Sequence, residues 1–305
     1  MEIITGTTQF CIEKETAVAI GKFDGVHIGH KRLLEEILEQ KKNGLAACVF
    51  TFDPPPAVLF GSSDGKELTT REEKRYLFRR MGVDILIEFP LNMETAAISP
   101  ETFAREILAR QMNAKYIAAG TDLSFGDKGA GNAQLLRTLG PELGFEVKTI
   151  DKVCIEGKEV NSTYIREMLK MGEMQQVQQF LGTPYTIKGT VMHGNRIGRT
   201  IGFPTVNLHP DESKLLPPNG VYYSRVLFGD KSYRAISNVG YKPTVTKERV
   251  LGVESFLYDF DEEIYDEVIE VSLYEYKRPE QRFGSLDELK MQLQQDIKEG
   301  QDYGI

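Results

Sequence analysis

The chain contains few of the features that mark secreted, zinc-binding or membrane proteins. It has three cysteines, Cys11, Cys48 and Cys154, and no C-x-x-C pair. An odd number of widely spaced cysteines predicts neither a disulfide framework nor a zinc site. No apolar run approaches about 18 residues, and the first residues lack a basic segment followed by an apolar one. We therefore expect a protein of the reducing cytoplasm, without a signal peptide or membrane contact.

The chain has fewer positively than negatively charged residues. Lysine and arginine number 37 against 45 aspartates and glutamates, for a net charge of −8. A general nucleic-acid binder has the opposite balance, so we expect small-molecule substrates and no nucleic acid. The length of 305 residues, 41% of them hydrophobic, suits two globular domains of about 150 residues each. The oligomeric state stays open between a monomer and weak self-association.

Short apolar runs alternate with amphipathic segments through the first half of the chain. The runs predict buried strands at 16–23, 45–52, 83–90, 114–120 and 145–153. The amphipathic segments predict helices at 30–43, 71–82, 99–112, 131–144 and 161–172. Strands and helices that alternate in this way are typical of a doubly wound parallel sheet.

The pattern changes after about residue 183. Runs rich in Val, Tyr, Phe and Thr are separated by Gly, Pro and Asn turns, at 185–192, 220–229, 231–240, 252–260 and 265–277. This spacing is typical of an antiparallel sheet or barrel. A last amphipathic segment, 285–300, predicts a helix that begins with a capping box of Ser285 and Glu288. We expect domains at 1–183 and 184–305.

The segment GKFDGVHIGH, residues 21–30, follows the first buried run and begins the first helix. Ligands of open parallel sheets bind at the carboxyl ends of strands, and free N–H groups at a helix start suit phosphate. His27 and His30 are three residues apart and share one face, where two imidazoles could bind phosphate oxygens. The alternative, a glycine-rich turn with two solvated histidines, is less favoured for so specific an arrangement.

Two further segments have weaker patterns of their own. Ser162 and Thr163 begin a helix and Arg166 lies one turn along it, which suits phosphate, although N-capping alone would explain the hydroxyls. Residues 189–208 form a glycine-punctuated basic stretch that matches neither a P-loop nor G-x-G-x-x-G. Its glycine content alone favours a long hairpin loop with solvated arginines.

The segment at 21–30 resembles the adenylyltransferase domain of bacterial riboflavin kinase/FMN adenylyltransferases, among the wider H-x-G-H nucleotidyltransferases. Segments 51–56, 120–126 and 161–166 resemble later family motifs, apart from Pro55 and Leu123. The resemblance implies a Rossmann-like domain that transfers AMP from ATP to FMN, giving FAD and pyrophosphate. It implies catalytic roles for His27, His30 and Arg166. It places ATP at Gly21, Phe23, Asp24, Gly25, His27, His30, Ser162, Thr163 and Arg166. It places flavin at Asp122 and at Phe125, which core packing would explain equally well.

The segment GRTIGFPTVN, residues 198–207, resembles the riboflavin kinase signature, and segments 218–222, 237–244 and 253–260 follow in family order. The resemblance implies a barrel domain that phosphorylates riboflavin to FMN with ATP and Mg²⁺. It implies that Glu254 is the general base and that Thr205 and Asn207 hold the metal. It places ATP at Gly198, Arg199, Gly202, Pro204, Thr205 and Asn207, and flavin at Arg278 and Phe283. For the last two, ordinary packing is nearly as good an explanation.

Other functions remain open at this point. The chain could keep only one of the two activities, or adenylylate another acceptor, since H-x-G-H alone permits that. A flavin- or RNA-binding regulator on the same folds is the alternative from another class. The P-T-x-N segment together with Glu254 favours the kinase, and the charge of −8 disfavours RNA. We also expect Mg²⁺ in the adenylyltransferase half, where the sequence shows no clear ligand.

Overall fold

The computed structural model describes residues 1–62, 64–193, 202–243 and 249–304. They form two compact units, Met1–Asn161 and Ser162–Ile305. The division falls earlier in the chain than the predicted boundary at 183, because the intervening helices α7 (Ser162–Met171) and α8 (Met174–Leu181) belong to the second unit. α8 packs against two strands of that unit. The functional division into 1–183 and 184–305 stays a prediction.

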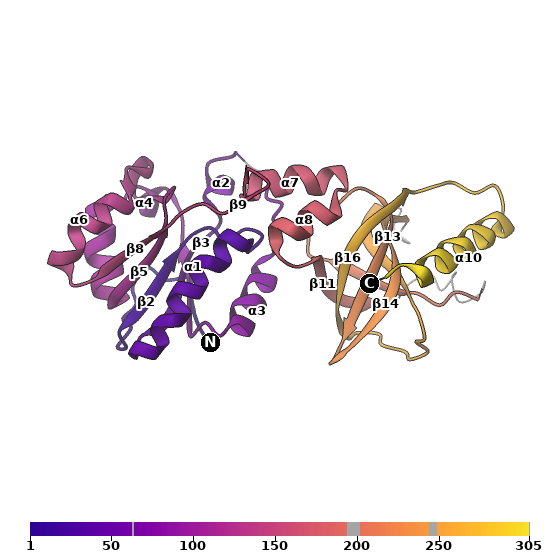
Figure 1. The fold of residues 1–305 in the computed structure, drawn as a ribbon, viewed down its shortest axis with the longest axis horizontal. Coiled ribbons are helices and arrows are strands. Elements are labelled where there is room, and N and C mark those ends of the chain that lie inside the picture. Colours follow the sequence, from indigo (N-terminus) through magenta and orange to yellow (C-terminus); the bar gives the residue numbers. More distant parts are fainter. Residues whose placement is uncertain (63, 194–201, 244–248, 305) are drawn as a thin grey trace. The chain divides into compact units, whose positions relative to one another are not determined.

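The first unit is built on a six-stranded parallel sheet (Figure 1). Its strands are β1 (Glu2–Thr5), β2 (Thr16–Ile20), β3 (Ala46–Asp53), β4 (Ile85–Pro90), β5 (Ala114–Gly120) and β8 (Glu146–Ile150), in the order β1-β4-β3-β2-β5-β8. All five pairings are parallel, which confirms the predicted sheet. The strand β1, which is only four residues long, was not predicted from the sequence.

Both faces of this sheet are covered. Successive residues of a strand point to opposite sides, so each strand contributes side chains to two separate cores. On one face, Val18 and Cys48 pack in a core with residues of the segment 103–112. On the other, Ala17 and Ala47 pack in a second core with apolar side chains of α1 and α3. The helices of this unit are α1 (Ile28–Glu39), α2 (Pro56–Leu59), α3 (Arg71–Met81), α4 (Met93–Ala96), α5 (Pro100–Thr102) and α6 (Ala133–Leu143).

Shorter elements complete the first unit. α5 begins at Ser99 and Pro100 as predicted, but it continues as the π-helix η2 (Phe103–Gln111). The 3₁₀ turns are η1 (Gln40–Asn43), ended by Gly44 at φ 83°, and η3 (Asp127–Gly129). Four two-residue strands pair as β6 (Ser124–Phe125) with β7 (Gly131–Asn132) and β9 (Cys154–Ile155) with β10 (Lys158–Glu159).

The strand order reverses direction beside β2. From β2 the chain builds outward through β3 and β4 on one side, and it later places β5 on the other side. The loops that leave β2 and β5 at their carboxyl ends therefore diverge, and this is where open α/β sheets bind ligands. The loop after β2 carries the GKFDGVHIGH segment.

The second unit contains a closed antiparallel barrel, which confirms the prediction of an antiparallel sheet or barrel (Figure 1). Its strands are β11 (Tyr185–Met192), β12 (Val206–Pro210), β13 (Gly220–Phe228), β14 (Lys231–Pro243), β15 (Arg249–Leu257) and β16 (Val268–Pro279), in the order β11-β12-β15-β14-β13-β16. Three serines form a chain of hydroxyl groups inside it, with Oγ atoms 2.8 Å apart for Ser224 and Ser237 and 2.6 Å for Ser237 and Ser255.

The last helix, α10 (Leu286–Asp302), packs on the barrel strand β14. The hydroxyl of Ser285 accepts the N–H of Glu288, as predicted for its N-cap. The carboxylate of Glu288, however, accepts the N–H of Gly284 instead of that of Ser285, so the predicted capping box is only half formed. None of the helices in the part of the chain described here is long and apolar enough to cross a membrane.

Candidate active sites

In the first unit, His27 itself begins helix α1. It is the N-cap residue, and its ring Nδ1 accepts the backbone N–H of His30 at 3.2 Å. The side chain thus does for the helix what a serine or aspartate usually does. Because Nδ1 accepts a hydrogen bond, the neutral ring carries its proton on Nε2. His27 can therefore present an N–H donor to a ligand while it caps the helix.

The two imidazoles lie against each other. The ring centroids of His27 and His30 are 3.7 Å apart, and the ring planes differ by 16°. Gly29 lies between them in the sequence, and a Cβ atom there would come within 3.2 Å of the His27 ring. A side chain at Gly29 would therefore press on the His27 ring and require it to shift slightly, which gives the glycine of H-x-G-H a structural reason that its place in the sequence did not show.

Burial keeps both rings neutral near pH 7. His27 is only 7% exposed, and burial lowers its pKa to about 4 although the charges of Asp24 and Asp122 act in the opposite direction. Burial also lowers the pKa of His30, with further contributions from His27 and Lys74. Nδ1 of His30 is buried without a hydrogen-bond partner among the described residues. Since buried polar atoms are nearly always paired, this atom marks a place for a ligand or a water molecule.

Phe23 and Asp24 shape the loop with their side chains. Phe23 is fully buried and meets Phe78 edge to face, with ring centroids 5.5 Å apart. Oδ1 of Asp24 accepts the backbone N–H of Leu68 at 2.8 Å and that of Thr69 at 3.4 Å. We expected both residues to bind ATP. In the structure, the side chain of Phe23 has no exposed surface and that of Asp24 helps to hold the loop, and the contacts of both residues with ATP stay predictions.

The two predicted loop glycines also have structural reasons to be there. The N–H of Gly25 donates to Oγ1 of Thr69 at 2.6 Å, and its φ of 86° favours glycine. The N–H of Gly21 donates to the carbonyl of Phe50 at 3.1 Å, and a Cβ on Gly21 would come within 3.1 Å of the Phe23 ring.

The loop after β5 brings a carboxylate toward the histidines. Asp122 is exposed, its charge acts on His27, and its Oδ2 lies 3.7 Å from Nζ of Lys152. Phe125 is 4% exposed, and its ring lies 5.2 Å from that of Phe103 in the hydrophobic core. Of the two roles weighed for Phe125, the structure supports core packing. The site at the reversal of strand order therefore comprises the histidine loop and Asp122.

Ser162, Thr163 and Arg166 lie at the start of α7, as predicted. Ser162 and Arg166 are half-buried and Thr163 is exposed. Because α7 belongs to the second unit, the expected action of these residues together with His27 and His30 stays a prediction.

In the second unit, three oxygen-bearing side chains meet on the outside of the barrel. The hydroxyl of Thr205 donates to Oε1 of Glu254 at 2.5 Å, and Asn207 lies directly opposite Glu254 in the ladder of β12 and β15. Val253 and Ser255 on either side are buried in the barrel, at 0% and 1% exposure, so Glu254 points outward. The predicted kinase residues are thus brought together on one face.

Asn238 extends this row by one strand. It lies directly opposite Glu254 in the ladder of β14 and β15, and its Nδ2 donates to Oε1 of Glu280 at 3.1 Å. Asn238 lies in a segment that resembles a family motif, 237–244, but the sequence predicts no role for it. The strand register places it beside Glu254.

The other predicted kinase residues have different surroundings. Gly202, at φ 89°, and Pro204 are exposed before β12, whereas Gly198 and Arg199 lie outside the described residues. Arg278 makes a two-pronged ion pair with Asp296 of α10, with Nε–Oδ1 and Nη2–Oδ2 distances of 3.1 and 2.5 Å. Of the two explanations for Arg278, flavin binding and ordinary packing, this ion pair supports packing. Phe283 is half-buried between β16 and α10.

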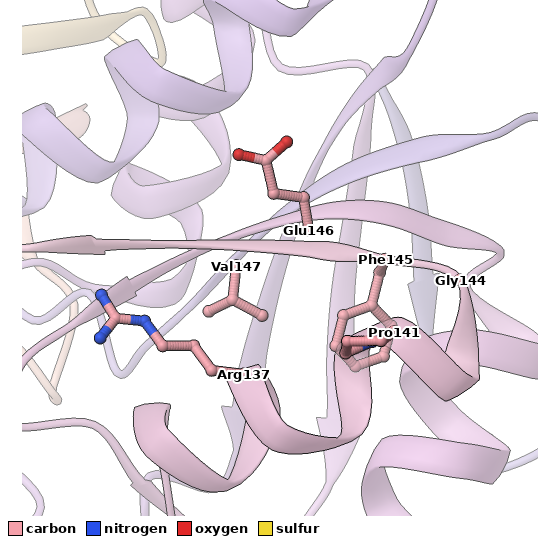
Figure 2. A pocket seen from close by; sticks show the side chains of 7 residues that line it. Arg137, Pro141, Gly144, Phe145, Glu146 and Val147 are labelled. Atoms are coloured by element: carbon pink, nitrogen blue, oxygen red, sulfur yellow. The ribbon is translucent and has the colours of Figure 1, made fainter.

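A hollow between α6 and β8 offers no comparable chemistry (Figure 2). It lies where β8 begins, at the amino ends of the parallel strands, whereas the histidine loop leaves β2 at its carboxyl end. Its two charged side chains, Arg137 and Glu146, point apart in Figure 2. No group of three or more His, Cys, Asp or Glu residues in the described ranges could hold a metal ion.

Comparisons with known proteins cover both units. The family model for FAD synthetase matches residues 10–164, and the model for riboflavin kinase matches residues 181–303. The bifunctional riboflavin kinase/FMN adenylyltransferase of Listeria monocytogenes is 34% identical, over 95% of this chain and 93% of its own length. That of Escherichia coli K12 is 37% identical, over 92% and 90%. The chain belongs to the bifunctional riboflavin kinase/FMN adenylyltransferase family.

Membership fixes the two activities: the chain phosphorylates riboflavin to FMN and converts FMN to FAD. Because each half matches its own family model, the alternatives of a single activity or a binding regulator are not supported. A solved structure from Streptococcus pneumoniae, described as a macrolide-efflux protein, is similar in fold. Its TM-score is 0.86 at 28% identity, with 99% of both chains covered. Similarity over the whole length confirms the combination of parallel-sheet domain and barrel.

Proposed function

We propose that the His27–His30 site carries out AMP transfer and that the Thr205–Asn207–Glu254 site carries out riboflavin phosphorylation. The observation that supports the second assignment is the 2.5 Å hydrogen bond from Thr205 to Glu254. It orients a carboxylate on the outer face of the barrel, where a substrate hydroxyl can reach it. The first assignment is supported by two stacked, neutral imidazoles at the start of a helix.

In the kinase reaction, Glu254 takes the proton of the riboflavin 5′-hydroxyl. The resulting oxygen attacks the γ-phosphorus of ATP, the bond to the β-phosphate oxygen breaks, and ADP leaves with that bonding pair. FMN is the product. Positioning and charge stabilisation account for most of the catalysis of such a step.

Mg²⁺ suits the second site, because hydroxyl, amide and carboxylate oxygens are the ligands that this ion prefers. Thr205 and Asn207 would hold it, and the bound ion would neutralise charge on the ATP phosphates. Thr205 can serve a metal and Glu254 together, since its oxygen has lone pairs free of the O–H that it donates.

In the adenylyltransferase reaction, a phosphate oxygen of FMN attacks the α-phosphorus of a second ATP. The bond between the α-phosphorus and the bridging oxygen breaks, and pyrophosphate leaves. His27 donates from Nε2 to the phosphates, His30 stabilises the charge that develops beside it, and Arg166 binds phosphate through its guanidinium. No covalent enzyme intermediate is needed. Asp122 binds the flavin substrate, and Mg²⁺ accompanies the ATP.

The experiment is to incubate the chain with riboflavin, ATP and Mg²⁺ and to separate the flavins by chromatography over time. We expect FMN first and FAD afterwards, both dependent on Mg²⁺. The same mixture with each site altered in turn assigns the activities to the sites. Loss of both products on alteration of one site, in a folded protein, would contradict the division.

A further inference from the structure

Helix α3 and the segment before it contact the histidine loop from a side that the proposed chemistry does not use. Lys74 on α3 is only 7% exposed, and its Nζ lies 2.8 Å from Oε1 of Glu67. Both side chains of this pair are largely buried, with 9% and 13% of their surfaces exposed. A buried ion pair is a weak source of stability, because desolvation offsets most of the attraction. Its position beside the loop therefore suggests another role.

Lys74 binds the segment 67–69, and this segment in turn hydrogen-bonds to the histidine loop. Glu67 directly precedes Leu68 and Thr69, whose N–H groups donate to Asp24. The hydroxyl of Thr69 also accepts the N–H of Gly25. Through Glu67, Lys74 is thus connected to the turn from which His27 and His30 project.

A chain of rings connects the same face of α3 to His30. Lys74 and Phe78 are four residues apart, so they lie on one face of the helix. Phe78 meets Phe23 edge to face, and the Phe23 ring centroid lies 5.1 Å from that of His30. The face of α3 that carries Lys74 therefore backs the His30 ring.

Charges around the two imidazoles are arranged asymmetrically. Asp24 in the histidine loop and Asp122 after β5 act on His27, and both are negative. The pKa of His30 is lowered by burial first, then by His27, and also by the positive charge of Lys74. A developing negative charge on a phosphate beside His30 would meet a positive potential from behind the ring.

We propose that Lys74 is a positioning residue for AMP transfer: with Glu67 it fixes the turn that carries His27 and His30, and it places a positive charge behind His30. This inference rests on the proposed role of His30. It adds α3, which carries none of the family motifs described above, to the adenylyltransferase site.

The test compares Lys74→Met, Lys74→Arg and the double variant Glu67→Gln/Lys74→Met. The double variant removes both charges together, so it leaves no unpaired charge if the single variant fails to fold. Lys41→Met is the matched control, because Lys41 pairs with Asp84 at 2.9 Å elsewhere in the same unit. Two properties are measured: the steady-state kinetics of FAD formation from FMN and ATP, which give kcat and KM, and the NMR titration of the His30 ring.

We expect kcat for FAD formation to fall about tenfold or more in Lys74→Met and in the double variant, while KM for FMN changes less than twofold. The titration of His30 should move to higher pH, since the repulsive charge is gone. Lys74→Arg should restore most of kcat, and Lys41→Met should change neither quantity. A purely structural role would lower stability without moving the titration.

The inference is overturned if the double variant folds with an unchanged kcat and an unchanged titration of His30. His30→Ala, assayed alongside, separates this failure from that of the proposed function. If His30→Ala loses FAD formation while the Lys74 variants keep it, only the role of Lys74 is wrong. If His30→Ala itself keeps FAD formation, the assignment of the site is wrong and the inference falls with it.

Discussion

The hydroxyl of Thr205, the residue directly before β12, donates a hydrogen bond to the carboxylate of Glu254 on β15. One residue from the P-T-x-N segment and one from a strand 49 positions later are thereby fixed in a single arrangement. The rotamer of the proposed base is set by the proposed metal ligand. We therefore expect changes at either residue to affect the same catalytic step.

Glu254→Gln should stop riboflavin phosphorylation and leave FAD formation intact when FMN is supplied. The amide keeps the shape of the side chain but cannot take a proton, so we expect a loss of about 100-fold or more in kcat. Chromatography of the flavins measures both activities in one sample. Glu270→Gln on β16, another half-buried barrel glutamate, is the control and should keep both. Phosphorylation within threefold of the unaltered chain would exclude Glu254 as the base.

His30→Ala should have the opposite effect. Removal of the ring takes away one of the three groups that we propose to act on the phosphates, so FAD formation should fall by about 100-fold or more while FMN formation continues. Amounts of FMN and FAD formed from riboflavin and ATP give the result. His209→Ala, which alters an exposed histidine in the barrel, should change neither. A simultaneous loss of FMN formation in folded protein would show that the sites are not independent.

Arg278→Ala tests whether this arginine holds α10 or binds flavin. The change leaves Asp296, which is 1% exposed, without its charged partner, so we expect the second unit to lose about 3 kcal/mol of unfolding free energy. Denaturant titration of the barrel measures this loss. Arg278→Ala/Asp296→Ala should cost less than the two single changes added together. A raised KM for riboflavin with unchanged stability would instead support flavin binding.

Acid should destabilise the first unit through His27. Its pKa is about 4 in the folded chain and about 6.5 when the ring is solvated. Between these values the unfolded chain binds a proton that the folded chain does not, so stability is complete above about pH 6.5 and falls toward pH 4. The difference corresponds to about 3 kcal/mol. Hydrogen exchange of the β2 and β3 amides at pH 7 and near pH 4 measures it.

His27→Asn is the variant for that experiment, because asparagine can cap α1 without titrating. The pH dependence of the stability of the first unit should decrease by the part that His27 contributes. The part that His30 contributes should remain, because burial lowers the pKa of His30 as well. His209→Asn should leave the pH dependence unchanged. If the stability of the first unit changed equally with pH in His27→Asn and in the unaltered chain, His27 would not be buried in its neutral form.

Local patterns in the sequence were sufficient to predict the parallel sheet and the barrel, whereas most of the candidate site residues came from the family resemblance and their roles stay predictions. Apolar runs located β2, β3, β4 and β5, and motif positions brought Thr205, Asn207 and Glu254 onto one face. The helix α8 was missed, and with it the compact unit to which α7 belongs. Helical periodicity gives the apolar face of such a segment but not the core against which that face packs.

The supporting contacts could not be predicted, because each depends on tertiary distance. Arg278 finds Asp296 only when α10 folds back on the barrel, and Asn238 faces Glu254 only in one strand register. Phe125 had two explanations in the sequence, and burial against Phe103 favoured one. A histidine as N-cap also departs from the residues usually expected there.

His27 uses the two nitrogens of its ring for different partners. Nδ1 accepts a backbone N–H of the helix, and Nε2 is left to donate to the proposed ligand. A surface histidine that binds a ligand must give up its side-chain rotations at that moment, which costs about 0.5–1.5 kcal/mol. The ring of His27 has already lost them during folding, through the cap and the stack on His30. The entropy of this donor is therefore lost when the domain folds and not when the nucleotide binds. Ordering of the His27 side chain does not reduce the affinity for the nucleotide.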